Sequence, residues 1–370
     1  MCCAGPIYDG LMDSISQPFE KLILLTEKEQ AAYRVGLSFP EKNLDLTRLL
    51  HLECFPTANV AIIDCPSYEA HQIQEKLSVL LDILNVSQFR PRRIVIKPAL
   101  VEAKLPSNNV TPHPNILYSL VKTLRSIFGE MPIVIAEASG HERDSELLIE
   151  RTKIRDVISD LRIKFIDLNL DDVVIVPVES PLTFKQFAIP KTVANSDFII
   201  SLAKMKTHHR TGVTLGMKNL MGCLPSSIYG FPKNKAHWMG ISKTIVDLSS
   251  VIKPQLTIID GIDAMEGDGP IYGTAKKENI LVAGLDVVAT DIVLTQIMNF
   301  SPLLIPKFWY ALAKGIMVNP NLIDERPVDK KRPDSFLPPP NISWLYESNL
   351  KSESEQIYFL GKLLDEGSHC

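Results

Sequence analysis

The sequence predicts an α/β protein with mostly parallel β-sheets covered by helices on both faces, in two subdomains with a cleft between them. Short runs rich in Val and Ile alternate with amphipathic helical segments from residue 59 to residue 298. The strand runs are apolar throughout, which is typical of parallel sheets buried on both faces. The chain has 370 residues, 45% of them hydrophobic, which is enough for a large core.

The elements follow one another in a regular order. Each predicted strand is apolar and β-branched and is bounded by turn-forming residues. The predicted strands are 59–65, 92–98, 131–137, 163–168, 171–178, 197–202, 256–261 and 279–284. Each predicted helix has apolar residues at helical spacing, and the second begins after Pro114, which favours a first turn. The predicted helices are 69–84, 115–128, 145–161, 237–252 and 286–298.

Three regions divide the chain. Residues 1–55 are predicted to form a helical N-terminal extension, and residues 56–300 form the α/β core. Residues 301–370 are a Pro-rich tail that we expect to wrap the core as irregular chain and to end in a helix at 353–364.

Composition excludes several classes of protein. A net charge of -4 argues against a nucleic-acid binder, which is usually basic. No apolar run reaches the roughly 18 residues that a membrane span needs, and the first residues do not form a secretory signal. The six cysteines are scattered without a C-x-x-C pair, so we expect a cytoplasmic location and no zinc ribbon or iron–sulfur cluster.

The segment 198–225, FIISLAKMKTHHRTGVTLGMKNLMGCLP, is the most informative. An apolar strand is followed at once by the polar residues Lys204, Lys206, Thr207, His208, His209 and Arg210. Ligands of open α/β sheets bind beyond the carboxyl ends of strands, so this cluster predicts an anion site. In an extended register Lys204 and Lys206 point the same way and Met205 points to the opposite face. Crowded cations lower one another's pKa values and favour an anionic ligand.

Other chemistry-bearing residues also follow predicted strands. Lys97 and Glu137 each end a strand, and His113 is held between two prolines in a rigid loop. Lys218, Asn219 and His237 come later, and His141 ranks below the other histidines because a Ser-Gly-His turn is often only a turn.

An acidic group, Asp260, Asp263, Glu266 and Asp268, lies in a Gly-rich stretch that we expect to be a flexible loop. It would bind a divalent cation through oxygen ligands or, as we favour, Asp260 and Glu266 would neutralise and orient the lysines.

Several of these motifs resemble one family. K-x-K-T-H at 204–208 and G-x-x-K-N-x-x-G-x-x-P at 216–225 are similar to the motifs of the domain of unknown function 362 family. The resemblance extends to IKPALV at 96–101, TPHP at 111–114, IAEASG at 135–140 and IIDGIDAMEGDGP at 258–270. It implies a fold and a site rather than a reaction. Many relatives carry a C-terminal ferredoxin-like cysteine run that this chain lacks, so the resemblance implies a form without that cluster.

We therefore expect an enzyme that acts on a small anionic substrate, a carboxylate or a phosphate, by His and Lys acid–base chemistry. The expected catalytic residues are His113, His208, Lys206 and Glu137. The expected ligand-binding residues are Lys97, Lys204, Thr207, Lys218, Asn219, Asp260 and Glu266. A divalent transition metal is one candidate cofactor, with His113, His208 and His237 as its expected ligands.

The kind of reaction stays open. Strand-end lysines with paired histidines are similar in kind to the residues of the nickel-pincer lactate racemase superfamily, which suggests racemisation, epimerisation or another proton or hydride shift. The alternative is a non-catalytic protein that binds an anion or a metal cofactor with the same residues. The expected partner is a small anionic ligand, with no nucleic acid and no membrane; a homo-oligomer stays open.

Overall fold

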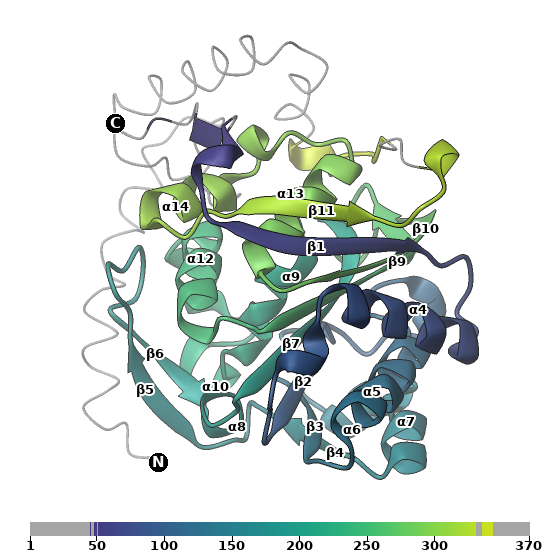
Figure 1. Cartoon of the computed structure of the whole chain (residues 1–370). Helices are drawn as coiled ribbons and strands as arrows, with labels where there is room; N and C mark the ends of the chain where they lie inside the picture. The colour runs from purple at the N-terminus through teal and green to yellow at the C-terminus, as the bar shows by residue number, and fades with distance from the viewer. Residues whose placement is uncertain (1–44, 46–47, 50, 331–334, 343–370) are drawn as a thin grey trace, which may run out of the picture.

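The computed structural model describes residues 45, 48–49, 51–330 and 335–342 (Figure 1). Most of the predicted N-terminal extension and the helix predicted at 353–364 lie outside the described residues. Within the described residues, no helix is long and apolar enough to cross a membrane.

The described residues form a nine-stranded sheet in the order β11-β1-β10-β9-β7-β2-β3-β4, with β8 paired to β7. Along this path β10 runs antiparallel to both neighbours, and the other neighbouring pairs are parallel. The strands are β1 (Thr57–Asp64), β2 (Ile94–Pro98), β3 (Ile133–Glu137), β4 (Lys164–Asp167), β7 (Phe198–His208), β8 (Gly212–Val213), β9 (Leu256–Glu266), β10 (Thr274–Gly284) and β11 (Asn319–Asp324). A separate two-stranded sheet pairs β5 (Val173–Pro177) with β6 (Gln186–Pro190).

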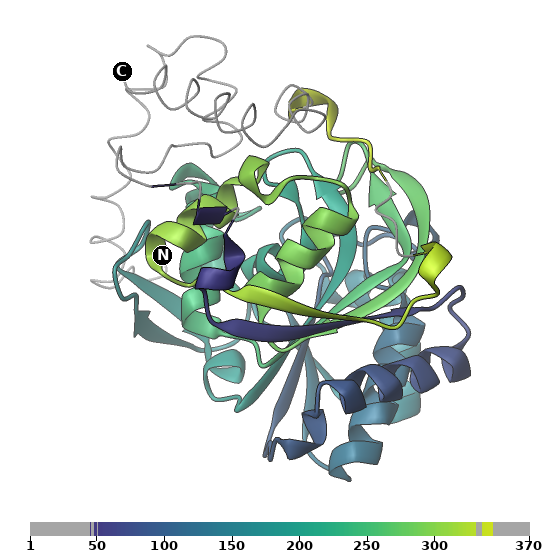
Figure 2. The ribbon, with the colours of Figure 1, turned by 45° about the horizontal axis from the view of Figure 1, so that its top comes forward.

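Helices cover both faces of the main sheet (Figure 2). The first face carries α4 (Ala70–Ile83), α5 (Pro114–Phe128), α6 (Ser145–Arg151) and α7 (Ile154–Leu161). The second carries α9 (Leu215–Asn219), α12 (Ile241–Ile252), α13 (Val287–Ile297) and α14 (Pro306–Lys314). Shorter helices are α8 (Lys191–Ala194), α10 (Ser226–Tyr229) and α11 (Asn234–Trp238). The 3₁₀ helices are η2 (Leu52–Cys54), η3 (Val86–Gln88), η4 (Pro106–Asn108), η5 (Leu220–Cys223), η6 (Pro302–Leu304), η7 (Val328–Lys330) and η8 (Pro340–Ile342).

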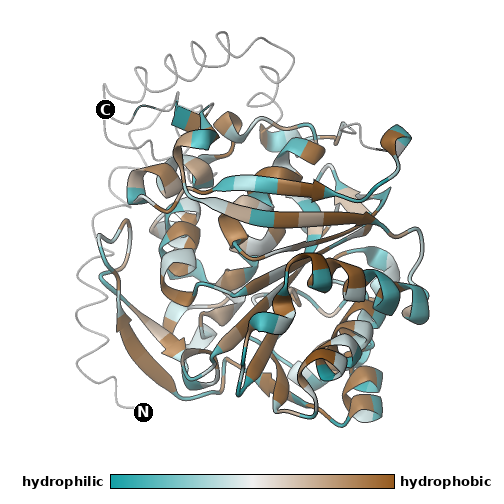
Figure 3. Ribbon diagram, in the orientation of Figure 1, coloured by the Kyte–Doolittle hydropathy of each residue, from teal (hydrophilic) through white to brown (hydrophobic). Residues whose placement is uncertain are grey.

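Two apolar cores follow from this layering, one on each face of the sheet. Strand β7 supplies both, because its side chains alternate: Ile200 packs in the core under α4 and α5, and Ile199 packs in the core under α12 and α13. In Figure 3 the central strands are largely hydrophobic. The predicted α/β class, with a large mostly parallel sheet flanked by helices, is confirmed.

Several element boundaries differ from those predicted. The helix predicted at 145–161 is two helices, with Lys153 at a positive φ of 63° between them. The strand predicted at 171–178 joins β6 rather than the main sheet. The helix predicted from His237 is divided, because α11 ends at Trp238 and α12 begins after Gly240. The tail is not only irregular, since it contributes α14 and edge strand β11, and the division into domains stays a prediction.

The arrangement of strands creates a natural ligand position. From β2 the chain proceeds outward to β3 and β4, then returns to place β7 on the other side of β2. The crossover helices change faces at this point, so β2 and β7 flank a topological switch point. Ligands of open α/β sheets bind outside the carboxyl ends of strands at such a point.

Candidate functional site

A cavity of about 240 Å³ lies at the carboxyl ends of β2, β3 and β7. Cations and imidazoles make up most of its polar lining: Lys97, Lys206, Lys218, Lys233, Arg210, His141, His208, His209 and His237. Among the described residues that line it, Glu137 is the single carboxylate. The cavity is therefore strongly cationic, although the whole chain carries a net charge of -4.

Glu137 is already paired within the protein. Lys97 Nζ lies 2.7 Å from Glu137 Oε2 and also donates to the carbonyl oxygen of Pro98 and to Asn219 Oδ1, so its three protons are used. Burial raises the pKa of the Glu137 carboxyl, and the charge of Lys97 opposes that shift. A Cβ at Gly222 would overlap both Glu137 Oε1 and Lys97 Nζ, so only glycine lets η5 approach the pair this closely.

Lys206 lines the same cavity but has no such partner. Its side chain is 1% exposed, and its Nζ donates to the carbonyl oxygens of Val110 and Pro270. Within the described residues, no carboxylate oxygen lies within ion-pair distance of Lys206 Nζ. Burial, with smaller contributions from Lys218 and other lysines, lowers the pKa of Lys206 to about 7. At neutral pH this amine is therefore divided between its charged and neutral forms.

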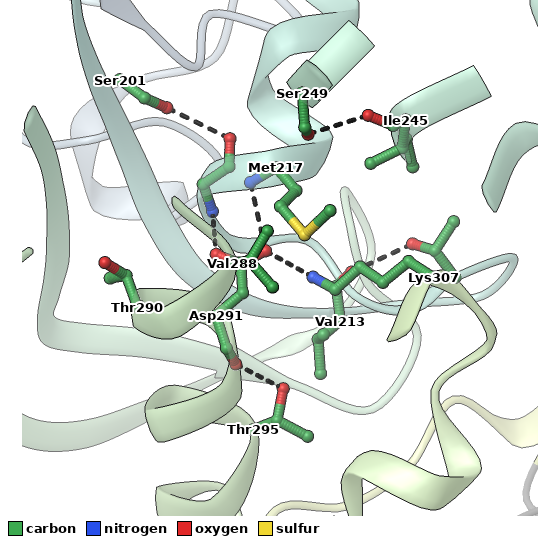
Figure 4. A network of polar contacts seen from close by, with 12 residues as sticks. Ser201, Val213, Met217, Ile245, Ser249, Val288, Thr290, Asp291, Thr295 and Lys307 are labelled. Carbon is green, nitrogen blue, oxygen red and sulfur yellow. Dashed lines mark hydrogen bonds and ion pairs between the residues drawn. The ribbon is translucent and has the colours of Figure 1, made fainter. Parts of the chain in front are cut away.

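Lys218 is presented by the short helix α9, which a buried carboxylate holds in place (Figure 4). Asp291 of α13 accepts from the backbone N–H of Gly216 at 2.7 Å and of Met217 at 3.1 Å. Lys307 of α14 neutralises this carboxylate by an ion pair. Burial, and next the charge of Lys97, lower the pKa of Lys218 to about 8.

His208 presents a proton. Its Nδ1 accepts from the backbone N–H of Arg210 at 3.0 Å, so in the neutral ring Nε2 carries the proton. Burial, followed by the charge of Lys218, holds the pKa of His208 well below its usual value. The ring is therefore a neutral hydrogen-bond donor at neutral pH.

His237 and His209 present the opposite tautomer. Their Nδ1 atoms face the carbonyl oxygens of Lys233 and Gly269, each at 3.0 Å, so Nδ1 donates and Nε2 keeps a lone pair. Burial, and next Lys218, lower the pKa of His237 to about 3. The cavity thus holds imidazole donors and acceptors together, which is the requirement for moving a proton.

A second polar cluster stands apart from the cavity lining. Lys204 Nζ lies 2.8 Å from both Asp260 Oδ2 and the hydroxyl of Tyr68, and the ring of His113 stacks on Tyr68 with centroids 4.1 Å apart. His113 caps α5, because its Nδ1 accepts from the backbone N–H of Asn115, and the backbone N–H of His113 donates to Asp260 Oδ2. In this cluster Lys204, Asp260, Tyr68 and His113 bind one another, which is the arrangement of residues that stabilise the fold.

The structure corrects part of the predicted site. Asp260, Asp263 and Glu266 lie on β9 rather than in a loop, because β9 continues to pair with β10. The interpretation that Asp260 orients a lysine agrees with its ion pair to Lys204, but Glu266 instead lies 3.7 Å from Lys276.

Thr207 bonds the carbonyl oxygen of Gly267 and does not line the cavity. Among the predicted metal ligands, His208 and His237 line the cavity and His113 does not. In the described part of the chain, no group of three or more His, Cys, Asp or Glu residues is placed to hold a metal ion.

The cavity does bring together Glu137, Lys97, Lys206, His208, Lys218, Asn219 and His237 from the predicted set. The expected catalytic and ligand-binding residues did not include His141, His209, Arg210 or Lys233, although the sequence placed His209 and Arg210 in the polar run that follows the apolar strand. The signal for Lys233 was present in the run KNKAHW, where it precedes His237 by one helical turn.

Comparisons with known proteins agree with the motifs. The family model for domain of unknown function (DUF362) matches residues 94–296, more than half of the 370 residues. The chain is 27% identical over 259 residues to the thylakoid-associated protein sll1697 of Synechocystis sp. (strain ATCC 27184 / PCC 6803 / Kazusa), which covers 67% of this chain and 77% of that protein.

A solved structure, the lactate racemase apoprotein from Thermoanaerobacterium thermosaccharolyticum, is similar at a TM-score of 0.43 and 12% identity, over 80% of this chain and 91% of that one. A likeness of this size carries no argument about function. The family match does identify the chain, which belongs to the DUF362 family.

Proposed function

We propose that the chain is an enzyme that binds a small anionic substrate, a carboxylate or a phosphate, and moves a proton on it by Lys and His acid–base chemistry. One observation carries the proposal: lysines, an arginine and histidines converge on a small cavity, and Glu137, the one carboxylate among the described residues that line it, is already neutralised by Lys97.

The anion-binding part follows from electrostatics. Neither Lys218 nor Arg210 has an acceptor for its side chain among the described residues, and burial lowers the pKa of both groups. Burying a cation without a partner costs free energy, and a bound anion offsets that cost. An anion bound in the cavity would therefore be stabilised by these cations, and a ligand with two or more anionic oxygens would use both side chains.

The acid–base part follows from the tautomers. The lone pair on His237 Nε2 is the candidate base, and the proton on His208 Nε2 is a donor to oxygen. A bound anion raises the pKa of each of these groups, which brings His237 closer to the range of a useful base. Glu137 Oε1 has no hydrogen-bond partner among the described residues and is a second acceptor.

Two measurements test the proposal. Isothermal titration with sulfate and with lactate is expected to show binding that Lys218→Met weakens and Lys164→Met, on the exposed edge strand β4, leaves unchanged. Proton abstraction is then tested by incubating lactate and other small hydroxy acids with the protein in D₂O and following exchange of the hydrogen beside the carboxylate by NMR.

The outcomes separate the two parts of the proposal. Exchange that His237→Gln abolishes supports the enzyme. Binding without exchange for any small acid supports the alternative, a non-catalytic anion-binding protein. Absence of binding for carboxylates and for inorganic anions alike removes the proposal.

A further inference from the structure

We propose that Lys206 is a nucleophile that forms an imine with the carbonyl carbon of a small oxo acid. The substrate class would then be an aldehyde or ketone that bears a carboxylate or a phosphate group. This inference rests on the proposed function, because the anionic group would be held by the same cations.

The hydrogen bonds of Lys206 are the first argument. Its Nζ donates to two carbonyl oxygens, those of Val110 and Pro270. A neutral amine has two hydrogens and one lone pair, so these two acceptors hold both hydrogens and leave the lone pair in the remaining tetrahedral position. Because Lys206 lines the cavity and is 1% exposed, a ligand in the cavity is the group available to that position.

Comparison with two other buried lysines, Lys97 and Lys204, is the second argument. Lys97 is paired with Glu137, and Lys204 with Asp260. Each of these two amines therefore lies against a carboxylate, at 2.7 Å for Lys97 and 2.8 Å for Lys204. Among the described residues, the acceptors of Lys206 Nζ are two neutral carbonyl oxygens, an environment that lets a lysine amine act as a nucleophile.

The neighbouring charges are the third argument. Burial, and next the charges of Lys218, Lys204 and Lys97, lower the pKa of Lys206 to about 7, and the charge of Glu102 opposes this shift. A large fraction of the amine is therefore neutral at neutral pH, as covalent catalysis by lysine requires. Lys218 suits a different role, since it has no protein acceptor among the described residues and is placed to bind the anionic group.

The step balances without another reactant. The lone pair of Lys206 Nζ attacks the carbonyl carbon, a C–N bond forms, and the π electrons of the C=O bond move to oxygen. The oxygen then leaves as water with the two amine hydrogens, and a C=N bond remains. When this imine is protonated it withdraws electrons from the adjacent carbon, whose hydrogen becomes acidic enough for the base His237 to remove.

Reductive trapping tests the inference on the full chain. The protein is incubated with pyruvate or with dihydroxyacetone phosphate, reduced with sodium borohydride, and analysed by intact mass and peptide mapping. We expect one reduced ligand per chain, located on Lys206, with less adduct when excess sulfate competes for the cavity. Lys206→Arg keeps a cation but cannot form an imine, and should lose the adduct; Lys164→Arg is the matched control and should keep it.

The result is read together with calorimetry of pyruvate and sulfate binding to the unmodified chain. Binding without an adduct, or an adduct on another lysine, overturns the imine and leaves the proposed function standing. If neither anion binds and no adduct forms, both proposals fail. Trapping of wild-type chain and its suppression by sulfate do not depend on how any variant folds.

Discussion

Replacing Lys206 by Met should change how the stability of the protein depends on pH. The folded-state pKa of Lys206, about 7, lies below the ordinary value of 10.5. The unfolded chain binds the proton of this amine more tightly than the folded chain does. Burial of the amine therefore lowers the free energy of unfolding by its full amount below pH 7, and this destabilisation decreases as the pH rises toward 10.5. At about 1.36 kcal/mol per pKa unit, the full penalty is about 5 kcal/mol.

The absolute effect of Lys206→Met combines two opposing contributions. Removing the amine relieves the penalty, but it also leaves the carbonyl oxygens of Val110 and Pro270 without their donor, at a cost of about 1–3 kcal/mol each. The change of stability with pH isolates the contribution of the amine, because the cost of leaving two carbonyl oxygens without a donor does not depend on pH. Between pH 7 and pH 9 the wild-type chain should gain about 2 kcal/mol of stability relative to Lys206→Met.

Urea unfolding of both chains at several pH values between 6 and 9 measures this difference. Lys164→Met, which removes an exposed lysine from β4, is run in parallel to account for the general effect of losing one lysine. Parallel stability curves for wild type and Lys206→Met would refute the reasoning, since they would mean that the amine stays charged throughout this range.

Four further outcomes are expected. Asp291→Asn should cost about 3–5 kcal/mol in urea unfolding, because it leaves Lys307 buried and unpaired, and sulfate titration should show weaker binding because α9 is no longer held. Gly222→Ala should cost about 1–3 kcal/mol through overlap with Glu137 and should also weaken sulfate binding; an unchanged affinity would contradict the close approach of η5. His113→Ala should lose about 1 kcal/mol of stacking and keep its sulfate affinity, whereas a loss of binding would place His113 in the site. Sulfate binding between pH 7 and pH 8 should take up protons, because the anion raises lysine pKa values; calorimetry in buffers of different ionisation enthalpy detects the uptake, and equal heats would count against it.

The sequence correctly predicted the features of the fold that depend on the spacing of apolar residues along one segment. Strand runs such as that of β7 are apolar because both faces are buried, and their alternation correctly placed Met205 on the face opposite Lys204 and Lys206. Division of the helix at 145–161 was missed, because apolar spacing on both sides of Lys153 fits one helix as well as two.

The site was harder to predict than the fold, because strand pairing decides it. Lys204 and Lys206 have similar surroundings in the sequence, but β9 pairs with β7 so that Asp260 lies directly beside Lys204. Lys204 is thereby neutralised by Asp260, whereas Lys206 lines the cavity. His113 lies outside the cavity lining for a related reason: the prolines that make it rigid also place it as the cap of α5.

The ion pair between Asp291 and Lys307 has a consequence for how the protein is divided into fragments. The family match ends at residue 296, but Lys307 lies beyond that point, as does β11, which pairs with β1. A fragment cut at the family boundary would leave the carboxylate beneath α9 buried without its cation and would expose an edge of the sheet. The segment that follows the family match therefore supports the helix that carries Lys218 in the cavity. Binding experiments require a chain that includes this segment.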